Sequence, residues 1–291
     1  MSRYRELTEH LKGLEDMRAI LAGMRTLAAV ELQRVTRLQD AGEQLRQGLE
    51  AAVAAHFAGR PPPPAPPEAG LCVLLGSEKG LCGDFNERLL AEAAHDARPL
   101  VLVGSKLAAT ALQVPAVAAR CPGALAADDV GPVLTGLAQT LAGLDAAGGG
   151  LDVLCHDPQQ HRVRRVAVLP PPTGTTTSEV TPRLQLPAPQ FEAALLEQYL
   201  LAVFNGLLIG SLLVENQQRI AHLQAALQRL DERCEGLRQR QRHARQEQII
   251  EEVEVALAIG GLTEGGRFGG QSGIEPPDLA HNRHQFPESG R

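Results

Sequence analysis

The chain has 291 residues, a net charge of −6 and an aromatic content of 3%, with no tryptophan. This charge balance argues against a nucleic-acid-binding protein, which would need a basic surface, and the aromatic content is low for a compact enzyme core. The five cysteines include no C-x-x-C pair, so the composition argues against a zinc site or a disulfide framework and favours free thiols in a reducing compartment.

Residues 1–58 are predicted to form one N-terminal helix. No proline occurs between Ser2 and Phe57, and the charged start of the segment predicts no signal peptide. Apolar side chains recur about every 3.5 residues, which is the spacing of a coiled-coil seam, although Arg18 and Arg25 interrupt it. The seam residues are Leu7, Leu11, Leu14, Leu21, Ala28, Leu32 and Val35, followed after a slip in register by Leu38, Leu45 and Leu49.

Residues 59–69 are predicted to be a linker. Proline occupies six of the seven positions from 61 to 67, and such a run forms a stiff, extended spacer that cannot continue a helix. A second linker, rich in proline and threonine, is predicted for residues 173–190.

Residues 70–172 are predicted to form an α/β domain, because short apolar strands alternate with helices. This alternation is typical of an open, mostly parallel sheet. The expected strands are 71–75, 99–103, 114–119, 151–155 and 163–169. The expected helices are 85–95, 105–112 and a third that Asp128 or Asp129 caps and that ends near residue 146.

The loop from Gly76 to Gly83 follows a strand and precedes a helix, as a phosphate-binding loop would. Its sequence matches neither G-x-x-x-x-G-K-[ST] nor G-x-G-x-x-G, so we interpret its glycines as residues that permit a tight turn. Cys82 has no histidine in a fixed relation that would serve as a base, and the nine histidines lack metal-ligand spacing. The sequence therefore predicts no catalytic residue, no cofactor and no metal site.

Residues 191–261 are predicted to form a second long helix, since no proline falls between Gln190 and Gly261. Its apolar positions follow in steps of three and four residues, the a/d pattern of a left-handed coiled coil. They are Ile220, Leu223, Leu227, Leu230, Cys234 and Leu237. The apolar run 200–214 is shorter than the roughly 20 residues that span a bilayer, so membrane association is expected only through a partner. Residues 262–291 are expected to form a disordered tail.

Two long helices at opposite ends of the chain, each with an apolar seam, are expected to pair with one another. The predicted fold class is therefore α/β, with a long antiparallel coiled coil of N- and C-terminal helices plus an open, mostly parallel α/β domain. An ordinary helical bundle is the alternative, and the position of the two long helices at the two ends of the chain argues against it.

The segment Lys79–Asn86 resembles the signature loop of the gamma subunit of F-type ATP synthases, usually G-L-C-G-G-[FL]-N after a basic residue. The matching loop residues are Gly80, Leu81, Cys82, Gly83 and Asn86. Asp84 replaces the second of the paired glycines, and Gly104-Ser105-Lys106 resembles a second segment of the family.

The two long helices carry further matches. Glu215 and Arg219 fit the family's S-E-x-x-A-R segment, Ala244–Gln246 stands on its A-R-Q, and Met24 fits a segment of its first helix. The family's usual lysines in that first helix are replaced by Ala19, Ala22 and Glu31. The resemblance, over about residues 2–260, is that of a divergent member similar to the N-type ATPases that some bacteria carry beside their main enzyme.

The resemblance implies a non-catalytic subunit, the central rotor shaft, which couples ion flow through a membrane c ring to nucleotide chemistry by rotation. The implied partners are the alpha and beta subunits of the catalytic hexamer, the epsilon subunit and the c-subunit ring, with no nucleic acid and with membrane contact only through the complex. The implied location is the cytoplasmic face of the bacterial inner (plasma) membrane.

The implied contacts with the beta subunit are Met24, Arg238, Arg242, Arg245 and Gln246. Basic side chains here would face acidic loops of the partner, whereas a solvated helix face is the alternative for 238–242. Two other functions remain open. One is a free-standing coiled-coil scaffold without ATPase partners, and the other is an α/β enzyme with helical arms that binds a ligand near Gly76–Asn86.

Overall fold

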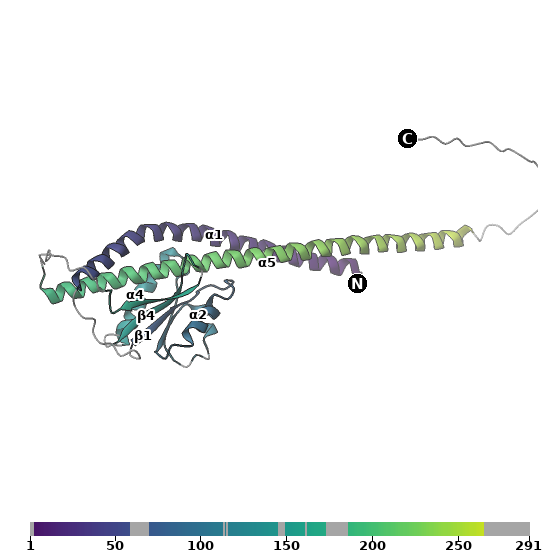
Figure 1. Cartoon of the computed structure of the whole chain (residues 1–291). Coiled ribbons are helices and arrows are strands. Elements are labelled where there is room, and N and C mark those ends of the chain that lie inside the picture. Colours follow the sequence, from purple (N-terminus) through teal and green to yellow (C-terminus); the bar gives the residue numbers. More distant parts are fainter. Residues whose placement is uncertain are drawn as a thin grey trace, which may run out of the picture. The chain divides into compact units, whose positions relative to one another are not determined.

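The computed structural model describes residues 3–58, 70–112, 114, 116–144, 149–160, 162–172 and 186–264. The predicted linker 59–69 and most of the predicted segments 173–190 and 262–291 lie outside these residues. The chain divides into two compact units, one of Leu11–Glu235 and one of Met1–His10 with Gly236–Arg291. Two long helices, α1 (Arg3–His56) and α5 (Ala188–Glu264), contribute residues to both units (Figure 1).

In the Leu11–Glu235 unit, α1 and α5 pack side by side along the predicted seam. The buried seam residues are Leu14, Ala28 and Val35 of α1 and Leu223, Leu227 and Cys234 of α5. The two arginines that interrupt the α1 stripe reach across to α5. Arg18 contacts Asp231, and Arg25 donates a hydrogen bond to Gln224 at 2.6 Å. Residue numbers rise along α1 as they fall along α5, so the predicted antiparallel pairing is confirmed in this unit.

The predicted slip of the α1 seam is wrong at Leu38 and Leu45, which are 42% and 64% exposed, whereas the third predicted residue, Leu49, is half-buried. The helix instead keeps the same face inward, on which Arg46 is half-buried and Val53 is buried. Arg46 is accommodated there because it pairs with two carboxylates of its own helix and because Gly206 of α5 leaves room for its side chain. Ion pairing and a facing glycine thus replace apolar residues on this part of the seam.

The α/β region contains a five-stranded sheet in the order β3-β2-β1-β4-β5. Neighbouring strands are parallel except β5, which is antiparallel to β4, so the predicted open, mostly parallel sheet is confirmed. The strands are β1 (Gly70–Leu75), β2 (Leu100–Val103), β3 (Val117–Cys121), β4 (Gly150–His156) and β5 (Val163–Leu169). The shorter helices are α2 (Phe85–Ala93), α3 (Ser105–Thr110), the 3-10 helix η1 (Ala127–Asp129) and α4 (Val130–Gly143).

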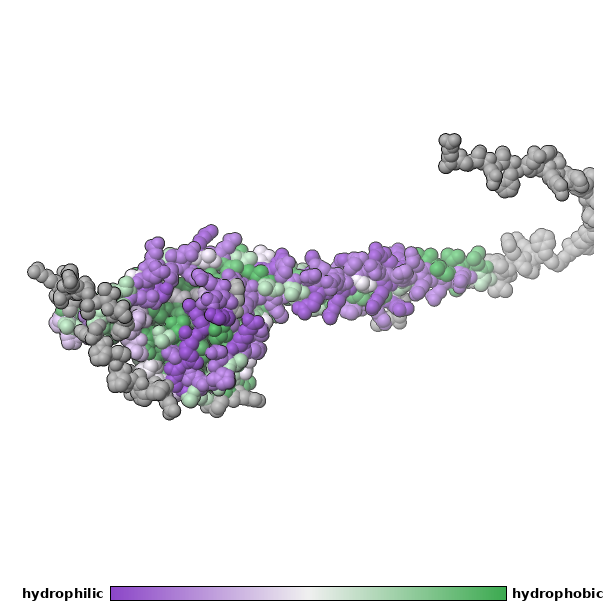
Figure 2. All heavy atoms as spheres, in the orientation of Figure 1, coloured by the Kyte–Doolittle hydropathy of each residue, from purple (hydrophilic) through white to green (hydrophobic). Residues whose placement is uncertain are grey.

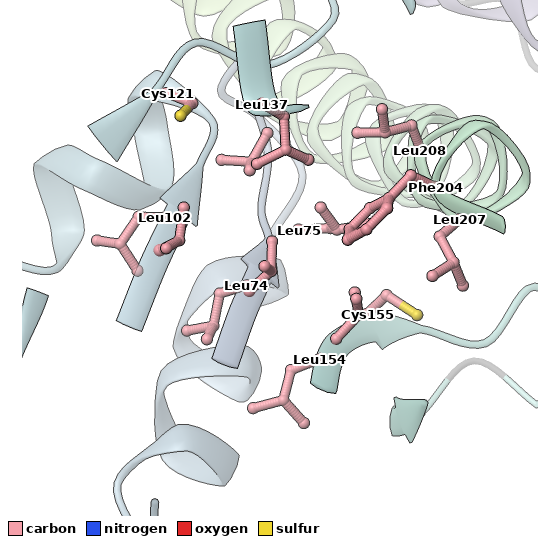
Figure 3. Packing of buried hydrophobic residues seen from close by; sticks show 14 of the residues in the cluster. Leu74, Leu75, Leu102, Cys121, Leu137, Leu154, Cys155, Phe204, Leu207 and Leu208 are labelled. Carbon is pink, nitrogen blue, oxygen red and sulfur yellow. The ribbon is translucent and has the colours of Figure 1, made fainter. Parts of the chain in front are cut away.

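The three inner strands of the sheet, β1, β2 and β4, are buried on both faces. Leu75 and Cys155 point toward Phe204 of α5, whereas Leu74 and Leu154 point to the opposite face (Figure 3). Successive strand side chains point to opposite faces, and burial of both faces explains the uninterrupted apolar runs in the sequence. All five cysteines of the chain are buried and unpaired.

Among the described residues, one helix, α5, contains an 18-residue window with a mean hydropathy of 1.5. By length and composition it is apolar enough to cross a membrane, so the expectation that its apolar run is too short does not hold on that measure. The window is 39% buried inside the chain, and Phe204, Leu208 and Leu212 belong to the same buried cluster as the strands. Packing against the sheet therefore accounts for much of the apolar run.

Candidate functional site

The loop from Gly76 to Gly83 leaves β1 at the carboxyl edge of the parallel strands. Two of its residues have positive φ angles, Leu81 at 65° and Gly83 at 66°. That conformation is uncommon for a residue with a side chain, so contacts around Leu81 must hold the loop in place. A Cβ at Gly76 would lie 2.3 Å from the Cβ of Leu107, which restricts this position to glycine. The tight turn predicted from the glycines is present.

Asn86 closes the loop from the first turn of α2. Its Oδ1 accepts a hydrogen bond from the Ser77 amide at 3.0 Å, and its Nδ2 donates to the Ser77 hydroxyl at 2.9 Å. Cys82 is buried with its Sγ 3.7 Å from the carbonyl oxygen of Lys79, and burial raises the pKa of this thiol. A buried thiol with a raised pKa is a poor nucleophile, so the geometry favours a packing role for Cys82.

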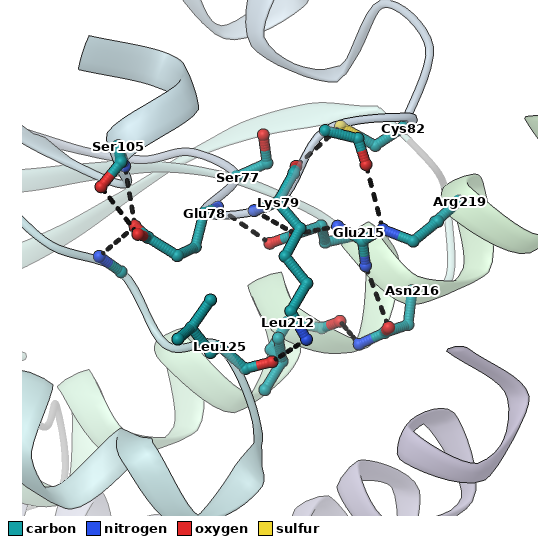
Figure 4. Close-up of polar contacts among 12 residues, drawn as sticks. Ser77, Glu78, Lys79, Cys82, Ser105, Leu125, Leu212, Glu215, Asn216 and Arg219 are labelled. Atoms are coloured by element: carbon teal, nitrogen blue, oxygen red, sulfur yellow. Dashed lines mark hydrogen bonds and ion pairs between the residues drawn. The ribbon is translucent and has the colours of Figure 1, made fainter. Parts of the chain in front are cut away.

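A buried carboxylate on α5 binds the same loop (Figure 4). Glu215 accepts hydrogen bonds from the backbone amides of Lys79 at 3.2 Å and Glu78 at 3.4 Å. It also pairs with Arg219, one turn further along the helix. Arg219 in turn donates from Nε to the carbonyl oxygen of Gly80 at 3.1 Å. The structure thus brings together two segments that the resemblance matched separately, the signature loop and Glu215–Arg219.

The Glu215–Arg219 pair is almost fully removed from solvent, with exposed fractions of 3% and 5%. Burial raises the pKa of Glu215, and the charge of Arg219 opposes that shift. Asn216 accepts a further hydrogen bond from Arg219 at 3.0 Å. Removal of one charge from such a pair leaves the other buried without compensation, which is strongly destabilising. The pair therefore fixes the loop against α5.

Glu78 is a loop residue that sequence reasoning did not single out. Its carboxylate accepts hydrogen bonds from the amide and hydroxyl of Ser105 and from the amide of Gly123, each at 2.7 Å. Burial by itself would raise the pKa of Glu78, but these hydrogen bonds lower it below its usual value. A Cβ at Gly104 would lie 2.7 Å from the backbone carbonyl oxygen of Ser77, so glycine at position 104 permits the two loops to approach one another. The sequence did contain a signal for this role of Glu78: it is an acidic residue that closely follows a strand, at the carboxyl edge of a parallel sheet where backbone amides are exposed.

The unit that contains the chain ends holds the basic stretch of α5. Ala244 is buried there, and Gln241 donates a hydrogen bond to the hydroxyl of Thr8 at 2.8 Å. The guanidinium of Arg245 lies 5.9 Å from the centroid of the Tyr4 ring, within the range of a cation–π contact. The two long helices therefore also pack against one another in this unit.

The residues predicted to contact a beta subunit are exposed. They are Arg238, Arg242, Arg245 and Gln246 in the unit with the chain ends, and Met24, at 39% exposure, in the other unit. Met24 belongs to a row of exposed apolar residues on α1, and a second group lies on α5 (green in Figure 2). The two groups are Met17, Ile20, Met24, Leu27 and Val30, and Ile249, Ile250, Val253, Val255 and Leu257. Exposed apolar groups of this kind mark candidate protein–protein surfaces.

The sequence matches a protein-family model described as ATP synthase over residues 3–256. The chain belongs to the ATP synthase gamma-subunit family. The residues that match the family model include α1, the α/β domain and most of α5. No curated protein matches the sequence significantly.

Solved structures with a similar fold come from mitochondrial ATP synthases. A chain of the Euglena gracilis enzyme, in its OSCP/F1/c-ring, is 14% identical with a TM-score of 0.65, over 94% of this chain and 98% of that chain. A chain of the Euglena rotor is 14% identical with a TM-score of 0.58, over 84% and 98%. A chain of the Tetrahymena thermophila central stalk and c ring is 15% identical with a TM-score of 0.57, over 71% and 99%. At sequence identities of 14% and 15%, the similarity shows that this gamma-family chain has the same fold as those three chains.

Proposed function

We propose that this chain is the central rotor shaft, or gamma subunit, of a rotary ATP synthase. Rotation of the shaft couples ion flow through a membrane ring of c subunits to nucleotide chemistry on the alpha and beta subunits. The observation that carries the proposal is the family match over residues 3–256, which includes both terminal helices and the α/β domain. Similar chains in solved structures come from a rotor and from a central stalk, which supports the proposal.

A shaft must transmit torque without shearing, and the seam between α1 and α5 in the Leu11–Glu235 unit is suited to that task. Buried apolar side chains hold the two helices together, and the Arg18–Asp231 and Arg25–Gln224 contacts fix their register. An asymmetric shaft presents a different face to each nucleotide site in succession, so one rigid element couples the sites. In this mechanism the chemistry takes place on the alpha and beta subunits, and this chain acts as the rigid element.

We assign the contacts with the beta subunits to Arg238, Arg242, Arg245 and Gln246 of α5 and to Met24 of α1. Exposed basic side chains on a chain with a net charge of −6 suit acidic partner loops, where opposite charges set orientation and association rate. The α/β domain is assigned to the epsilon subunit and the c ring. The loop residues Gly80, Leu81, Cys82, Gly83 and Asn86 are assigned a structural role in joining that domain to α5.

The chain is further proposed to lie on the cytoplasmic face of a bacterial inner membrane, held there through the c ring. The resemblance to N-type ATPases supports a bacterial source, whereas the solved neighbours are mitochondrial. Cell fractionation distinguishes the two. The chain should appear in the plasma-membrane fraction and should be released together with the alpha and beta subunits by a low-salt wash. Recovery from mitochondria would contradict the proposed location.

The proposed function is tested by co-expression with alpha and beta subunits, size-exclusion chromatography and an ATPase assay with and without this chain. We expect a hexamer that contains the chain and whose turnover depends on it. Arg245→Ala combined with Gln246→Ala should lower turnover about tenfold. Gln228→Ala combined with Arg229→Ala, at exposed positions of the same helix, is the matched control. If the chain elutes alone and the hexamer is indifferent to it, the rotor proposal fails and the free-standing scaffold replaces it.

A further inference from the structure

Three charged side chains hold the segment 123–127, between β3 and α4, at alternate residues. The pairs are Glu78 with the Gly123 amide at 2.7 Å, Lys79 Nζ with the Leu125 carbonyl oxygen at 2.6 Å, and Glu31 with the Ala127 amide at 2.6 Å. Figure 4 shows the pair of Lys79 and Leu125. The side chains come from the loop after β1 and from α1, so the segment is a point where separate parts of the Leu11–Glu235 unit converge.

Both long helices reach segment 123–127, and they do so by different routes. α5 reaches it through Glu215, whose carboxylate binds the amides of Glu78 and Lys79, the two residues whose side chains hold the segment. α1 reaches it directly through Glu31, a half-buried residue between the buried seam positions of that helix. The segment is therefore connected to each of the two helices of the seam.

The bond from Glu31 meets a specific need of the backbone. Ala127 begins η1, which leads into α4, and amides at a helix start lack partners within the helix. A negative charge is favoured there by the helix dipole. The nearby carboxylate of Asp129 already accepts the Ala126 amide at 3.0 Å. Glu31 therefore satisfies the next amide from a position 96 residues away in the sequence.

We propose that Glu31 is a positioning residue that ties α1 to the α/β domain, so that both shaft helices turn with that domain. This inference rests on the proposed rotor function. Glu215 and Arg219 already fix α5 to the loop after β1. Without Glu31, α1 follows the domain through the apolar packing of Val35 and Val53 and through its seam with α5, and part of the applied torque is lost in twisting the two helices against each other.

The contact itself is tested in the isolated full-length chain by hydrogen exchange at the Ala127 amide. Glu31→Ala should accelerate exchange about tenfold, because the amide loses a charged acceptor. Glu31→Gln keeps an acceptor oxygen and should stay close to wild type, as should Gln33→Ala, an exposed position on the same helix. Unchanged exchange in Glu31→Ala overturns the proposal whether or not the chain assembles with ATPase subunits.

The role in rotation is tested in the assembled complex, reconstituted in lipid vesicles, by the amount of ion pumped per ATP hydrolysed. Glu31→Ala should lower this ratio about twofold or more while ATP hydrolysis stays near wild type, and Glu31→Gln should restore it. A purely structural role would lower hydrolysis and pumping together, and that result overturns the inference. Failure of the wild-type chain to assemble overturns the proposed function instead, so the two failures are distinguishable.

Discussion

Arg219 of α5 donates a hydrogen bond to the backbone oxygen of Gly80 at 3.1 Å, which joins residues 139 positions apart in the chain. Gly80 immediately precedes Leu81, whose positive φ angle of 65° needs support from its surroundings. The same guanidinium pairs with Glu215, so one buried side chain holds both the turn and the carboxylate that binds its amides. The loop after β1 is therefore built onto α5 and is not an independent surface loop.

Arg219→Met should lower the free energy of unfolding by about 3 to 5 kcal/mol, because it leaves Glu215 buried without a counter-charge. Urea unfolding followed by circular dichroism measures the change. Arg229→Met, at an exposed position of the same helix, is the control and should change stability by less than about 0.5 kcal/mol. Addition of Glu215→Gln to Arg219→Met should recover part of the loss, since the two side chains interact directly. Equal effects of the two arginine substitutions would contradict a buried pair.

Gly76→Ala should destabilise the chain by about 2 kcal/mol or more, because the new methyl group would lie 2.3 Å from the Cβ of Leu107. Gly136→Ala is the matched substitution. A Cβ there meets nothing within 4 Å, and alanine favours α4, so a gain of about 0.5 to 1 kcal/mol is expected. Thermal unfolding of the two variants should therefore shift in opposite directions. A gain in stability for Gly76→Ala would show that the loop packs differently against α3.

The stability of the chain should depend on pH through His156. Its Nε2 lies 2.9 Å from the carbonyl oxygen of Phe85 and donates to it, and its buried Nδ1 has no hydrogen-bond partner among the described residues. Burial lowers the pKa of His156, so below about pH 6.5 the unfolded chain binds a proton that the native state does not. As the pH is lowered from about 6.5, the free energy of unfolding should therefore decrease by up to about 1.4 kcal/mol per pH unit, until the pH reaches the pKa of His156 in the native state.

Unfolding curves at pH 7.5 and 5.5 measure the pH dependence of His156. His156→Gln, which keeps a donor for Phe85, should show a smaller loss of stability between the two pH values than wild type. His95→Gln removes an exposed histidine and should leave the loss unchanged. The same loss in His156→Gln as in wild type would assign the pH dependence to other groups.

Much of the fold follows from local patterns in the sequence. The strand runs predicted β1 and β4 to within a residue or two, because a strand buried on both faces must be largely apolar. The prediction of β5 also matched, although that edge strand carries exposed arginines. The α1 seam beyond residue 35 was predicted correctly only at Leu49, since apolar Leu38 and Leu45 suggested a stripe while the helix turns half-buried Arg46 inward through ion pairs. Ion pairs that accommodate a charged residue on an inward face leave no periodic pattern in the sequence.

The candidate site was predicted only where the family resemblance reached. Glu215, Arg219 and Asn86 stand on matched motifs, and the structure brings them to one loop. Glu78 was not predicted as a site residue, and Glu31 was named only as a replacement for one of the family's lysines. Their partners lie 27 and 96 residues away, and contacts over such distances depend on tertiary packing that no local pattern encodes.

Two leucines on the long helices should separate seam packing from partner contact. Leu223 is fully buried between the helices in the Leu11–Glu235 unit, whereas Leu27 is 72% exposed. Leu223→Ala should lower the free energy of unfolding of the isolated chain by about 3 kcal/mol, because it leaves a cavity in the seam. Leu27→Ala should change it by less than about 0.5 kcal/mol, because the side chain packs against little within the chain.

In the assembled hexamer, substitution of Leu27 should have a larger effect than substitution of Leu223 if the exposed row around Met24 and Leu27 contacts the catalytic subunits. Leu27→Asp should then weaken retention of the chain on size-exclusion chromatography with alpha and beta subunits, because a charge replaces an apolar contact. Leu223→Ala should be retained at temperatures below its own unfolding transition. Full retention of Leu27→Asp, with turnover at the wild-type level, would show that this row of α1 faces solvent in the complex and would remove Met24 from the proposed contacts.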